Sequence, residues 1–252
     1  LEDLKEATKQ PYRVIGAGSN LLVSDEGVKE RVVKLGQTFN NLKNFKNQSD
    51  VWLGSSTPLP GLIRRAQQAG LSGLEGLLGV PAVLGGAIAM NAGTRYGEMS
   101  DTLQEVEVFV NGELERLSAS ALGLRYRHSE IPQGAIITRA RLKLTPSTPE
   151  AVQAKLDQVD AARKGQPKQK SAGCAFKNPV GYSAGKLIDE AGLKGTRVGD
   201  AMVSLEHGNF IVNLGNATAK DVLALLDLIR HRISIQYNDA VALETEWQLW
   251  GF

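Results

Sequence analysis

Cysteine and histidine are scarce in this chain, which has one cysteine and three histidines in 252 residues. A single cysteine excludes an intrachain disulfide framework and a zinc cluster built from cysteines. Three widely spread histidines do not favour a histidine-rich site, and we therefore expect no metal centre. The one thiol, Cys174, could be core filler, a metal ligand or a participant in chemistry.

A charge excess is also lacking, because 29 Lys and Arg stand against 27 Asp and Glu, for a formal net charge of +2. No basic stripe interleaved with aromatic residues is present, so we expect no nucleic-acid partner. The first residues, LEDLKEATKQ, contain no signal-like apolar core, and we expect a cytoplasmic protein. The missing initial Met leaves open that the natural N-terminus lies upstream.

Long apolar runs are absent apart from residues 76–93, GLLGVPAVLGGAIAMNAG, which carry no charge and approach the length of a membrane span. This segment has many glycines, a proline and an asparagine, and it lacks a continuous stripe of bulky apolar side chains. We interpret it as buried backbone packed closely against a large group, and not as a membrane helix.

Hydrophobic periodicity predicts an α+β protein of two regions. Helices are expected from Pro58 to Gly70 with Thr57 as N-cap, over 149–164, over 183–192, and after the capping box of Thr218 and Asp221. A hairpin turn is expected at Asn111 and Gly112. The predicted strands are 12–15, 21–25, 31–35, 103–110, 135–144, 209–214 and 241–250.

Two glycine-rich segments are candidates for binding phosphates. In Gly16–Leu22, GAGSNLL, successive N–H groups could point into one concavity, although the spacing alone favours a glycine-rich tight turn. In residues 76–93, Pro81 could begin a helix whose first amides face an anion, and Gly85 and Gly86 would allow a flat ligand to approach. Two such segments in one region favour a long ligand with phosphates.

Cys174 lies in KSAGCAFKNPVG, residues 170–181. Free cysteines are often buried filler. A cationic setting, supplied here by Lys170 and Lys177, would instead lower the thiol pKa and make a good proton donor or nucleophile. The residues alone leave these two interpretations open.

In chain order, several segments resemble the patterns of one family, the UDP-N-acetylenolpyruvoylglucosamine reductases, also called UDP-N-acetylmuramate dehydrogenases. The resemblance covers nearly the whole chain and is closest to the shorter subclass, which lacks an inserted tyrosine-bearing loop. The matching segments are GAGSNLLVSD (16–25), GLEGLLGVPAVLGGAIAMNAG (73–93), GEMSD (97–101), YRHS (126–129), SAGCAFKNP (171–179), AGKLIDEAGLKG (184–195), EHGNFIVN (206–213) and LETEW (243–247).

The resemblance implies an FAD-binding region of the vanillyl-alcohol-oxidase/PCMH type, built from two α+β lobes, and a C-terminal α+β substrate-binding domain. We expect the FAD-binding region at 1–144, with lobes of about 1–45 and 46–144, and a linker at 145–149. The substrate-binding domain would follow at 150–240, and a C-terminal strand bearing Glu246 at 241–252. The implied reaction uses NADPH and FAD to reduce UDP-N-acetylglucosamine enolpyruvate to UDP-N-acetylmuramate in peptidoglycan synthesis, and a monomer is expected.

The same resemblance implies three catalytic residues. Arg127 would stabilise the negative charge that develops on the substrate, and Glu246 would act as a protonated carboxyl or through a water. Cys174 occupies the position of the proton donor, where the family most often has serine. A thiol pKa near ~8.5 is far closer to the working pH than that of an aliphatic hydroxyl, which favours this exchange.

Cofactor and substrate residues are also carried over by resemblance. The cofactor residues would be Gly16, Ala17, Gly18, Ser19, Asn20, Leu21, Gly79, Val80, Pro81, Gly85, Gly86, Ala87, Asn91 and Gly93. The substrate residues would be Tyr126, Lys164, Gly173, Lys177, Asn178, His207 and Asn209, with the segment 163–170 near the diphosphate. Two rival interpretations are another flavoprotein of the same superfamily and a non-catalytic flavin-binding or nucleotide-binding module.

Overall fold

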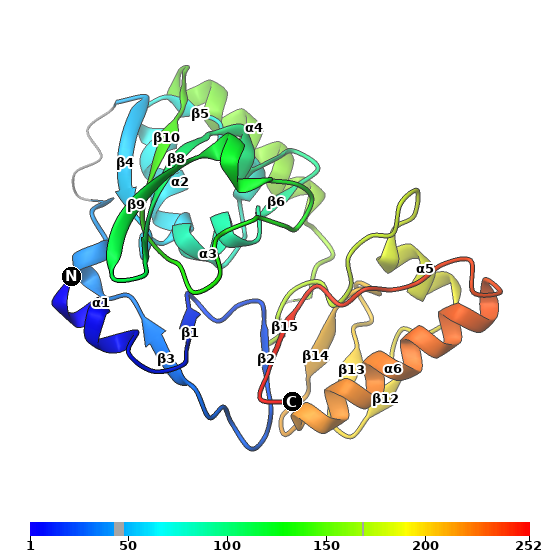
Figure 1. The fold of residues 1–252 in the computed structure, drawn as a ribbon. Coiled ribbons are helices and arrows are strands. Elements are labelled where there is room, and N and C mark those ends of the chain that lie inside the picture. Colours follow the sequence, from blue (N-terminus) through cyan, green and yellow to red (C-terminus); the bar gives the residue numbers. More distant parts are fainter. Residues whose placement is uncertain (43–47, 168) are drawn as a thin grey trace. The chain divides into compact units, whose positions relative to one another are not determined.

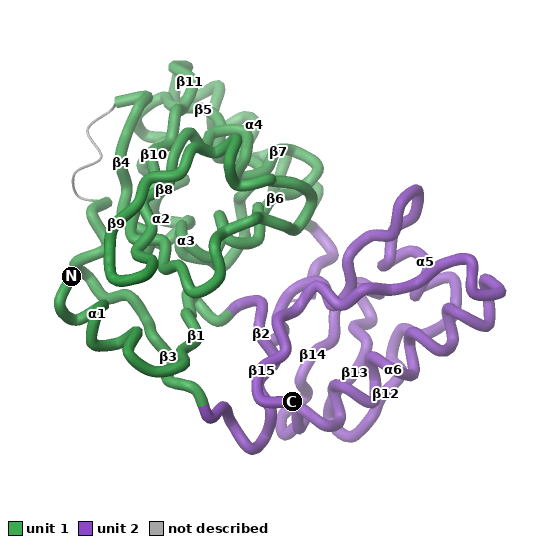
Figure 2. The backbone as a smooth tube through the Cα atoms, viewed as in Figure 1, with its two compact units in different colours: residues 1–18, 30–163 green, residues 19–29, 164–252 purple. Residues whose placement is uncertain are grey.

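The chain forms two compact units in a computed structural model that describes residues 1–42, 48–167 and 169–252. Unit 1 contains residues 1–18 and 30–163, and unit 2 contains residues 19–29 and 164–252 (Figure 2). Within the described ranges, none of the helices combines the length and apolar character that a membrane crossing needs.

The elements of unit 1 run through its two chain segments (Figure 1). In order they are α1 (Glu2–Ala7), β1 (Tyr12–Ile15), β3 (Arg31–Lys34), η1 (Gln37–Phe39), β4 (Asp50–Gly54), α2 (Leu59–Gln68), β5 (Leu71–Ser72), η3 (Glu75–Leu77), α3 (Leu84–Ala89), β6 (Gly93–Thr94), β7 (Gly97–Glu98), η4 (Met99–Asp101), β8 (Leu103–Val110), β9 (Glu113–Ser118), η5 (Ala119–Leu122), β10 (Ile136–Lys143), β11 (Thr145–Pro146) and α4 (Pro149–Ala162).

An antiparallel sheet with strand order β4-β10-β8-β9 organises unit 1. Strands β8 and β9 form the predicted hairpin, and Asn111 and Gly112 take the positive φ values of 51° and 84° that its turn requires. Figure 1 shows α2 and α3 on one side of this sheet. Helix α2 turns four apolar residues, Leu59, Leu62, Ile63 and Ala66, into the core, because their spacing places them on one helical face.

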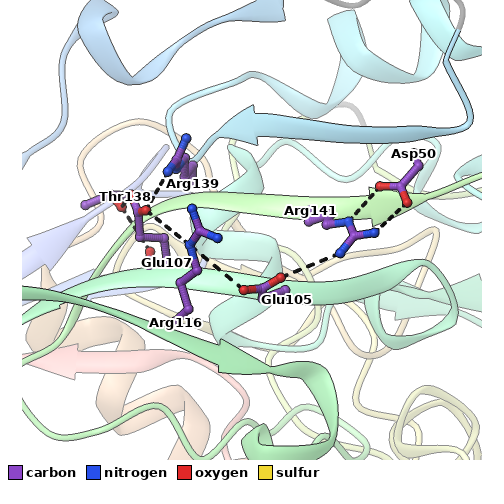
Figure 3. A network of polar contacts seen from close by, with 7 residues as sticks. All are labelled: Asp50, Glu105, Glu107, Arg116, Thr138, Arg139 and Arg141. Carbon is purple, nitrogen blue, oxygen red and sulfur yellow. Dashed lines mark hydrogen bonds and ion pairs between the residues drawn. The ribbon is translucent and has the colours of Figure 1, made fainter.

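Charged side chains on neighbouring strands form a network around Glu107 (Figure 3). The Glu107 carboxylate accepts hydrogen bonds from Arg139 at 2.6 Å and from Thr138 at 3.0 Å. Burial acts to raise the pKa of Glu107, but these hydrogen bonds and the charges of Arg139 and Arg116 outweigh it and lower that pKa below its ordinary value. The guanidinium groups of Arg139 and Arg116 both lie about 5 Å from the Trp52 ring, at 4.9 and 5.1 Å. Cross-strand ion pairs therefore reinforce this sheet.

Unit 2 has a smaller sheet and its own apolar core. Its elements are β2 (Leu21–Val23), α5 (Ala184–Glu190), β12 (Arg197–Val198), β13 (Ala201–Val203), β14 (Ile211–Asn213), α6 (Ala219–Gln236) and β15 (Gln248–Trp250). Strands β2 and β15 pair in parallel, although they come from opposite ends of the chain. The capping box of Thr218 and Asp221 begins α6 as predicted, and the Asp25 carboxylate also accepts the Ala219 N–H at 2.8 Å.

Three local predictions are wrong. The N-cap of α2 is Pro58, and the buried Thr57 hydroxyl caps nothing. Pro81 does not begin a helix, since α3 starts at Leu84 and its first amides donate to the carbonyls of Thr57 and Ser55 at 2.9 and 2.8 Å. The alternating segment 241–250 is a regular strand only over 248–250, because its earlier part pairs with 175–177 through isolated contacts. Helix α1 was not indicated by the sequence pattern.

The compact units differ from the predicted domain division in two places. Helix α4 packs in unit 1, where Val152 and Leu156 join the main core, while the predicted linker pairs with β5 through β11. Residues 19–29 leave the N-terminal region and belong to unit 2, which splits the predicted phosphate-binding segment after Gly18. The predicted boundary between two lobes, near residue 45, lies outside the described residues.

Candidate functional site

A cavity of about 590 Å³ opens in unit 1 between β1, the β3–η1 connection and the start of α3. Its walls are mainly apolar, and they include Gly16, Gly85 and Gly86 from the predicted cofactor residues. The other lining residues are Val14, Ile15, Lys34, Leu35, Gly36, Gln37, Ser55, Ser56, Val83, Ala89, Ser129, Ile131, Ala135 and Ile137. Pockets of this size hold small organic ligands and cofactors.

The cavity walls fit a flat, largely apolar group with polar edges. A side chain added at Gly86 would meet nothing nearer than Val83 Cγ2 at 4.0 Å, so this glycine leaves open space over the first turn of α3. The Ser55 hydroxyl is buried and has no hydrogen-bond partner among the described residues. An orphaned hydroxyl on an apolar wall is the kind of group that a bound ligand satisfies. These features suit the ring system of a flavin.

Sequence reasoning missed most of this wall. Ser55, Gly36 and Ser129 come from three connections that are distant in the sequence and meet only in the fold. Two local signals were present: the run of small residues Gly54–Ser56 at the end of β4, and the YRHS motif, which ends in Ser129. Ser129 is fixed beside α3 by a 2.7 Å hydrogen bond to the Ala89 carbonyl.

The remaining predicted cofactor residues lie in several settings. Gly79 takes φ +77°, and its carbonyl accepts a 3.0 Å hydrogen bond from the Arg163 guanidinium. Ala87 and Gly93 are buried in the fold. Ala17, Gly18, Val80 and Pro81 belong to unit 1, and Ser19, Asn20 and Leu21 belong to unit 2.

Asn91, another predicted cofactor residue, is fully buried and its amide is committed to the protein. Its Nδ2 donates to Glu98 Oε1 at 2.9 Å and to the Arg125 carbonyl at 3.2 Å, and its Oδ1 accepts from the Ser100 N–H at 3.0 Å. The structure therefore gives Asn91 a role as a brace between α3, η4 and the turn at Arg125, and direct cofactor contact through its side chain is not supported.

Arg127 sits in that turn, where Arg125 and His128 pair through their backbones. Its φ is +54°, a left-handed conformation that costs free energy for a residue other than glycine and is found most often at functional sites. The guanidinium donates to the Gly93 carbonyl at 2.8 Å and lies 4.9 Å from the ring centre of Tyr126. A cation is thus held in a defined place beside the predicted substrate residue Tyr126.

Cys174 and Glu246 occupy neighbouring segments of unit 2. Cys174 is half-buried and pairs with Phe210 through a backbone bridge. The Glu246 N–H donates to the carbonyl of Ala175 at 2.9 Å, and the Glu246 carbonyl accepts from the Asn20 side chain at 3.2 Å. The fold therefore brings the two predicted catalytic residues of unit 2 onto neighbouring, hydrogen-bonded segments.

Lys177 and Asn178 follow on the same segment. The Lys177 ammonium pairs with Glu244 Oε1 at 2.6 Å, and Asn178 Oδ1 accepts the first amide of α5, from Ala184, at 3.0 Å. Gly173 takes φ +79°, as a shaped loop requires, and Lys164 is exposed. Of the predicted diphosphate segment 163–170, residue 168 lies outside the described residues.

His207 and Asn209 have partners within the protein. His207 Nδ1 accepts the Asn209 N–H at 3.2 Å, burial lowers the pKa of this imidazole, and the charge of Lys194 lowers it further. Asn209 is 3% exposed, and both ends of its amide bond the main chain of Phe176. The Asn209 amide is thus engaged with the main chain of Phe176, and its assignment as a substrate residue stays a prediction.

No cluster of three or more His, Cys, Asp or Glu side chains suited to a metal ion occurs in the described part of the chain.

Sequence comparison matches two parts of the chain to known domains. A profile described as an FAD binding domain matches residues 3–118, and a profile described as UDP-N-acetylenolpyruvoylglucosamine reductase, C-terminal domain, matches residues 166–250.

Curated relatives match over almost the whole chain. The UDP-N-acetylenolpyruvoylglucosamine reductase of Thermus thermophilus is 57% identical over 249 residues, which are 99% of this chain and 89% of the relative. The enzyme of the same name from Deinococcus radiodurans is 53% identical over 258 residues, with 99% and 87% covered. A crystal structure of UDP-N-acetylenolpyruvylglucosamine reductase from Thermus caldophilus has a TM-score of 0.90 and 56% identity, and the match covers 99% of this chain and 89% of that one.

Fold, cavity and matched domains together define an FAD-dependent oxidoreductase with an α+β FAD-binding region of the vanillyl-alcohol-oxidase type. More specifically, the chain belongs to the UDP-N-acetylenolpyruvoylglucosamine reductase family. It is an enzyme of peptidoglycan synthesis that reduces the enolpyruvyl ether of UDP-N-acetylglucosamine, with FAD as cofactor and NADPH as co-substrate. The interpretations as another flavoprotein and as a non-catalytic binding module are set aside by this membership.

Proposed function

We propose that Cys174, Arg127 and Glu246 carry out the chemical step, with Cys174 as the general acid. The observation that supports this most strongly is the pairing of Glu246 N–H with the Ala175 carbonyl, directly after Cys174. It holds the segment that carries the thiol next to the segment that carries the carboxyl, within one unit. The chain contains no second cysteine that could take this role.

The charge that develops on the substrate dictates the three roles. Bound FAD supplies the hydride-transfer chemistry. Once the terminal vinyl carbon of the substrate has gained a hydride, negative charge builds on the adjacent carbon and on its carboxylate. Arg127 stabilises this enolate-like state, and the Cys174 thiol gives its proton to the carbanionic carbon, which completes the lactyl ether.

Arg127 suits an electrostatic role because its cation is preorganised. The bond to the Gly93 carbonyl and the Tyr126 ring hold the guanidinium on a rigid turn, so little reorganisation is needed when charge develops. Glu246 acts as a protonated carboxyl or through a water molecule, since a bare carboxylate would repel the substrate anion. The backbone N–H and the backbone carbonyl of Glu246 are both hydrogen-bonded, which fixes the position of its Cα and so the origin of its side chain.

Cofactor and substrate are held by different sets of residues in this proposal. Gly16, Gly85, Gly86 and the Ser55 hydroxyl would line the flavin ring system. Lys177, Asn178, Lys164, Gly173 and Tyr126 would serve the UDP-sugar, and Lys177 would exchange its Glu244 partner for a phosphate oxygen.

We further infer a cytoplasmic monomer. A thiol that donates a proton has to stay reduced, and reducing compartments keep free cysteines in that state. Each unit also has its own apolar core within one chain. Light scattering of the purified protein tests the oligomeric state.

The proposed reaction is tested by following the flavin under anaerobic conditions. NADPH should bleach the yellow protein, and addition of UDP-N-acetylglucosamine enolpyruvate should restore its colour with formation of UDP-N-acetylmuramate. Bleaching without recovery on substrate would contradict the assigned substrate. A protein that binds no flavin would contradict the assignment of the cavity.

A further inference from the structure

The two residues that follow Cys174 are hydrogen-bonded to a single residue, Asn209. Asn209 Oδ1 accepts the Phe176 N–H at 2.9 Å, and Asn209 Nδ2 donates to the Phe176 carbonyl at 2.7 Å. The Asn209 carbonyl also accepts the Ala175 N–H at 2.8 Å. Three hydrogen bonds therefore run from one buried residue to two consecutive residues of the segment Cys174–Lys177, which we name the thiol segment.

Glu246 is attached to the other side of the thiol segment. Its N–H bonds the Ala175 carbonyl at 2.9 Å, and the Lys177 N–H bonds the Glu244 carbonyl at 2.8 Å. Phe176 is 1% exposed, with the Arg230 guanidinium 5.5 Å from its ring centre, so the segment is anchored through its centre. Any slip of this segment would move Cys174 relative to Glu246.

The backbone pairing in this region is short and would fix the register weakly by itself. Cys174 with Phe210 and Phe176 with Thr245 are isolated bridges and not parts of longer strands. A carboxamide is the one short side chain that presents a donor and an acceptor side by side, as a peptide does. The Asn209 amide thus adds to these isolated bridges a pair of hydrogen bonds to the Phe176 N–H and carbonyl, as a neighbouring strand would.

We propose that Asn209 is a positioning residue of the reduction, which sets the register of the thiol segment and so holds the Cys174 thiol in place relative to Glu246. This inference rests on the proposed function for its effect on catalysis, but the placement of the thiol can be measured separately. A residue that merely stabilised the fold would change the free energy of unfolding and leave thiol reactivity and flavin reoxidation unchanged.

Alkylation by iodoacetamide reports on Cys174 alone, because the chain has one cysteine. Asn209→Leu keeps the approximate size and removes both hydrogen bonds. We expect the alkylation rate of the folded holoenzyme to change severalfold, and substrate-dependent flavin reoxidation to slow by about 10²-fold, the usual effect of misplacing a reacting group by about 1 Å. The matched control is Asn216→Leu, at an exposed asparagine of the same unit, for which both rates should equal those of the parent.

Asn209→Asp provides a rescue arm. The ionised carboxyl repels the Phe176 carbonyl, whereas the protonated carboxyl both donates and accepts and restores the native pair. Burial beside a carbonyl raises the pKa of the introduced carboxyl, so its rates relative to the parent should recover as the pH falls. Contributions of His207, Lys177, Glu244, Glu246 and Cys174 itself are shared with the parent and cancel in this ratio. No recovery should occur in Asn209→Leu.

Parent-like alkylation and reoxidation rates in a folded Asn209→Leu would overturn the proposal, as would an Asn209→Asp ratio that does not depend on pH. Hydrogen exchange of the parent adds a test that does not depend on variant folding. Slow exchange of the Phe176 N–H is expected, and fast exchange would overturn the proposed role of Asn209 in holding the thiol segment. Turnover of Cys174→Ala at the parent rate would contradict the proton-donor role of Cys174, but it would leave the positioning role of Asn209 untouched. Altered alkylation in Asn209→Leu would still support the positioning role.

Discussion

The Arg127 guanidinium donates a 2.8 Å hydrogen bond to the Gly93 carbonyl, while the Arg127 backbone is held at φ +54°. A left-handed conformation costs a non-glycine residue about 1–2 kcal/mol. The fold accepts this cost in the turn between Arg125 and His128, which the buried Asn91 amide braces. Backbone strain is therefore placed in the turn that holds the proposed catalytic cation.

Replacing Arg127 with glycine or alanine separates the strain from the chemistry. Both variants lose the guanidinium and should slow substrate-dependent flavin reoxidation by at least about 10²-fold. Arg127→Gly should nevertheless be about 1 kcal/mol more stable than Arg127→Ala, because only glycine adopts this φ freely. Urea unfolding of the two proteins measures the difference. Equal stabilities would show that the turn relaxes when the side chain is removed.

Gly86→Ala tests the flavin cavity without a large change in the fold. A methyl group here faces open space, with Val83 Cγ2 at 4.0 Å as its nearest neighbour, so the apoprotein should fold normally. FAD should bind about 10–200-fold more weakly, the usual effect of one misplaced methyl group in a pocket. Flavin titration of the apoprotein gives the dissociation constant.

Gly61→Ala in α2 is the matched control for the cavity variant. It introduces the same change in helix propensity outside the cavity, with the flexible end of Leu42 at 3.0 Å. Its FAD affinity should equal that of the parent. Unchanged FAD affinity in Gly86→Ala would contradict the placement of the flavin over α3.

Glu107→Gln should reduce the stability of unit 1 by about 1–3 kcal/mol at neutral pH, because it removes a charged acceptor from Arg139 and Thr138. The folded-state pKa of Glu107 is lowered, so its ionised form stabilises the fold above the ordinary Glu pKa of 4.5. This contribution is lost as the pH falls through the folded-state pKa. Parent and variant should therefore converge in acid.

Glu105→Gln is the control for the network, since the ion pairs of Glu105 are longer, at 4.0 Å to Arg116 and 3.8 Å to Arg141. Thermal unfolding between pH 3 and 8 compares the three proteins. A Glu105→Gln variant that is destabilised as much as Glu107→Gln would show that the short Arg139 contact has no special weight.

His207 predicts a second pH effect, in unit 2. Burial lowers its folded-state pKa below the ordinary value of 6.5, so the unfolded chain takes up its proton first as the pH falls. Stability is therefore fully present above the unfolded-state pKa and is lost as the pH falls toward the folded-state pKa. His207→Asn keeps an acceptor for the Asn209 N–H and should remove this pH dependence between pH 7.5 and 5, measured by urea unfolding.

The exposed His231 on α6 offers the matching substitution, His231→Asn. This control should retain the pH dependence of the parent. If the His207→Asn variant also retains it, another group in unit 2 controls acid stability.

Elements with strong local signals could be predicted from the sequence. The Asn111–Gly112 hairpin, the α6 capping box and the strand Leu103–Val110 agree with the structure, because turn chemistry and periodicity are properties of neighbouring residues. Helix α3 was placed wrongly at Pro81, since its true start depends on carbonyls of Ser55 and Thr57 that reach it only in the fold.

Motif resemblance identified the family and the candidate catalytic residues, but it could not show which polar residues serve the protein itself. Asn91 and Asn209 lie within matching motifs, and both have their amides committed to the backbone of the segments that carry Arg127 and Cys174. Such partners are distant in sequence, and no local pattern reveals them. The structure shows both amides supporting segments that carry candidate catalytic residues, while their assignment as ligand residues stays a prediction.

The proton-donor role of Cys174 is tested most directly by anaerobic stopped-flow reoxidation of NADPH-reduced enzyme with saturating enolpyruvyl substrate. Loss of a general acid predicts that Cys174→Ala reoxidises about 10²–10⁴-fold more slowly than the parent while it retains FAD, and that Cys174→Ser keeps substantial activity. Reoxidation of Cys174→Ala at the parent rate would contradict this role for the thiol.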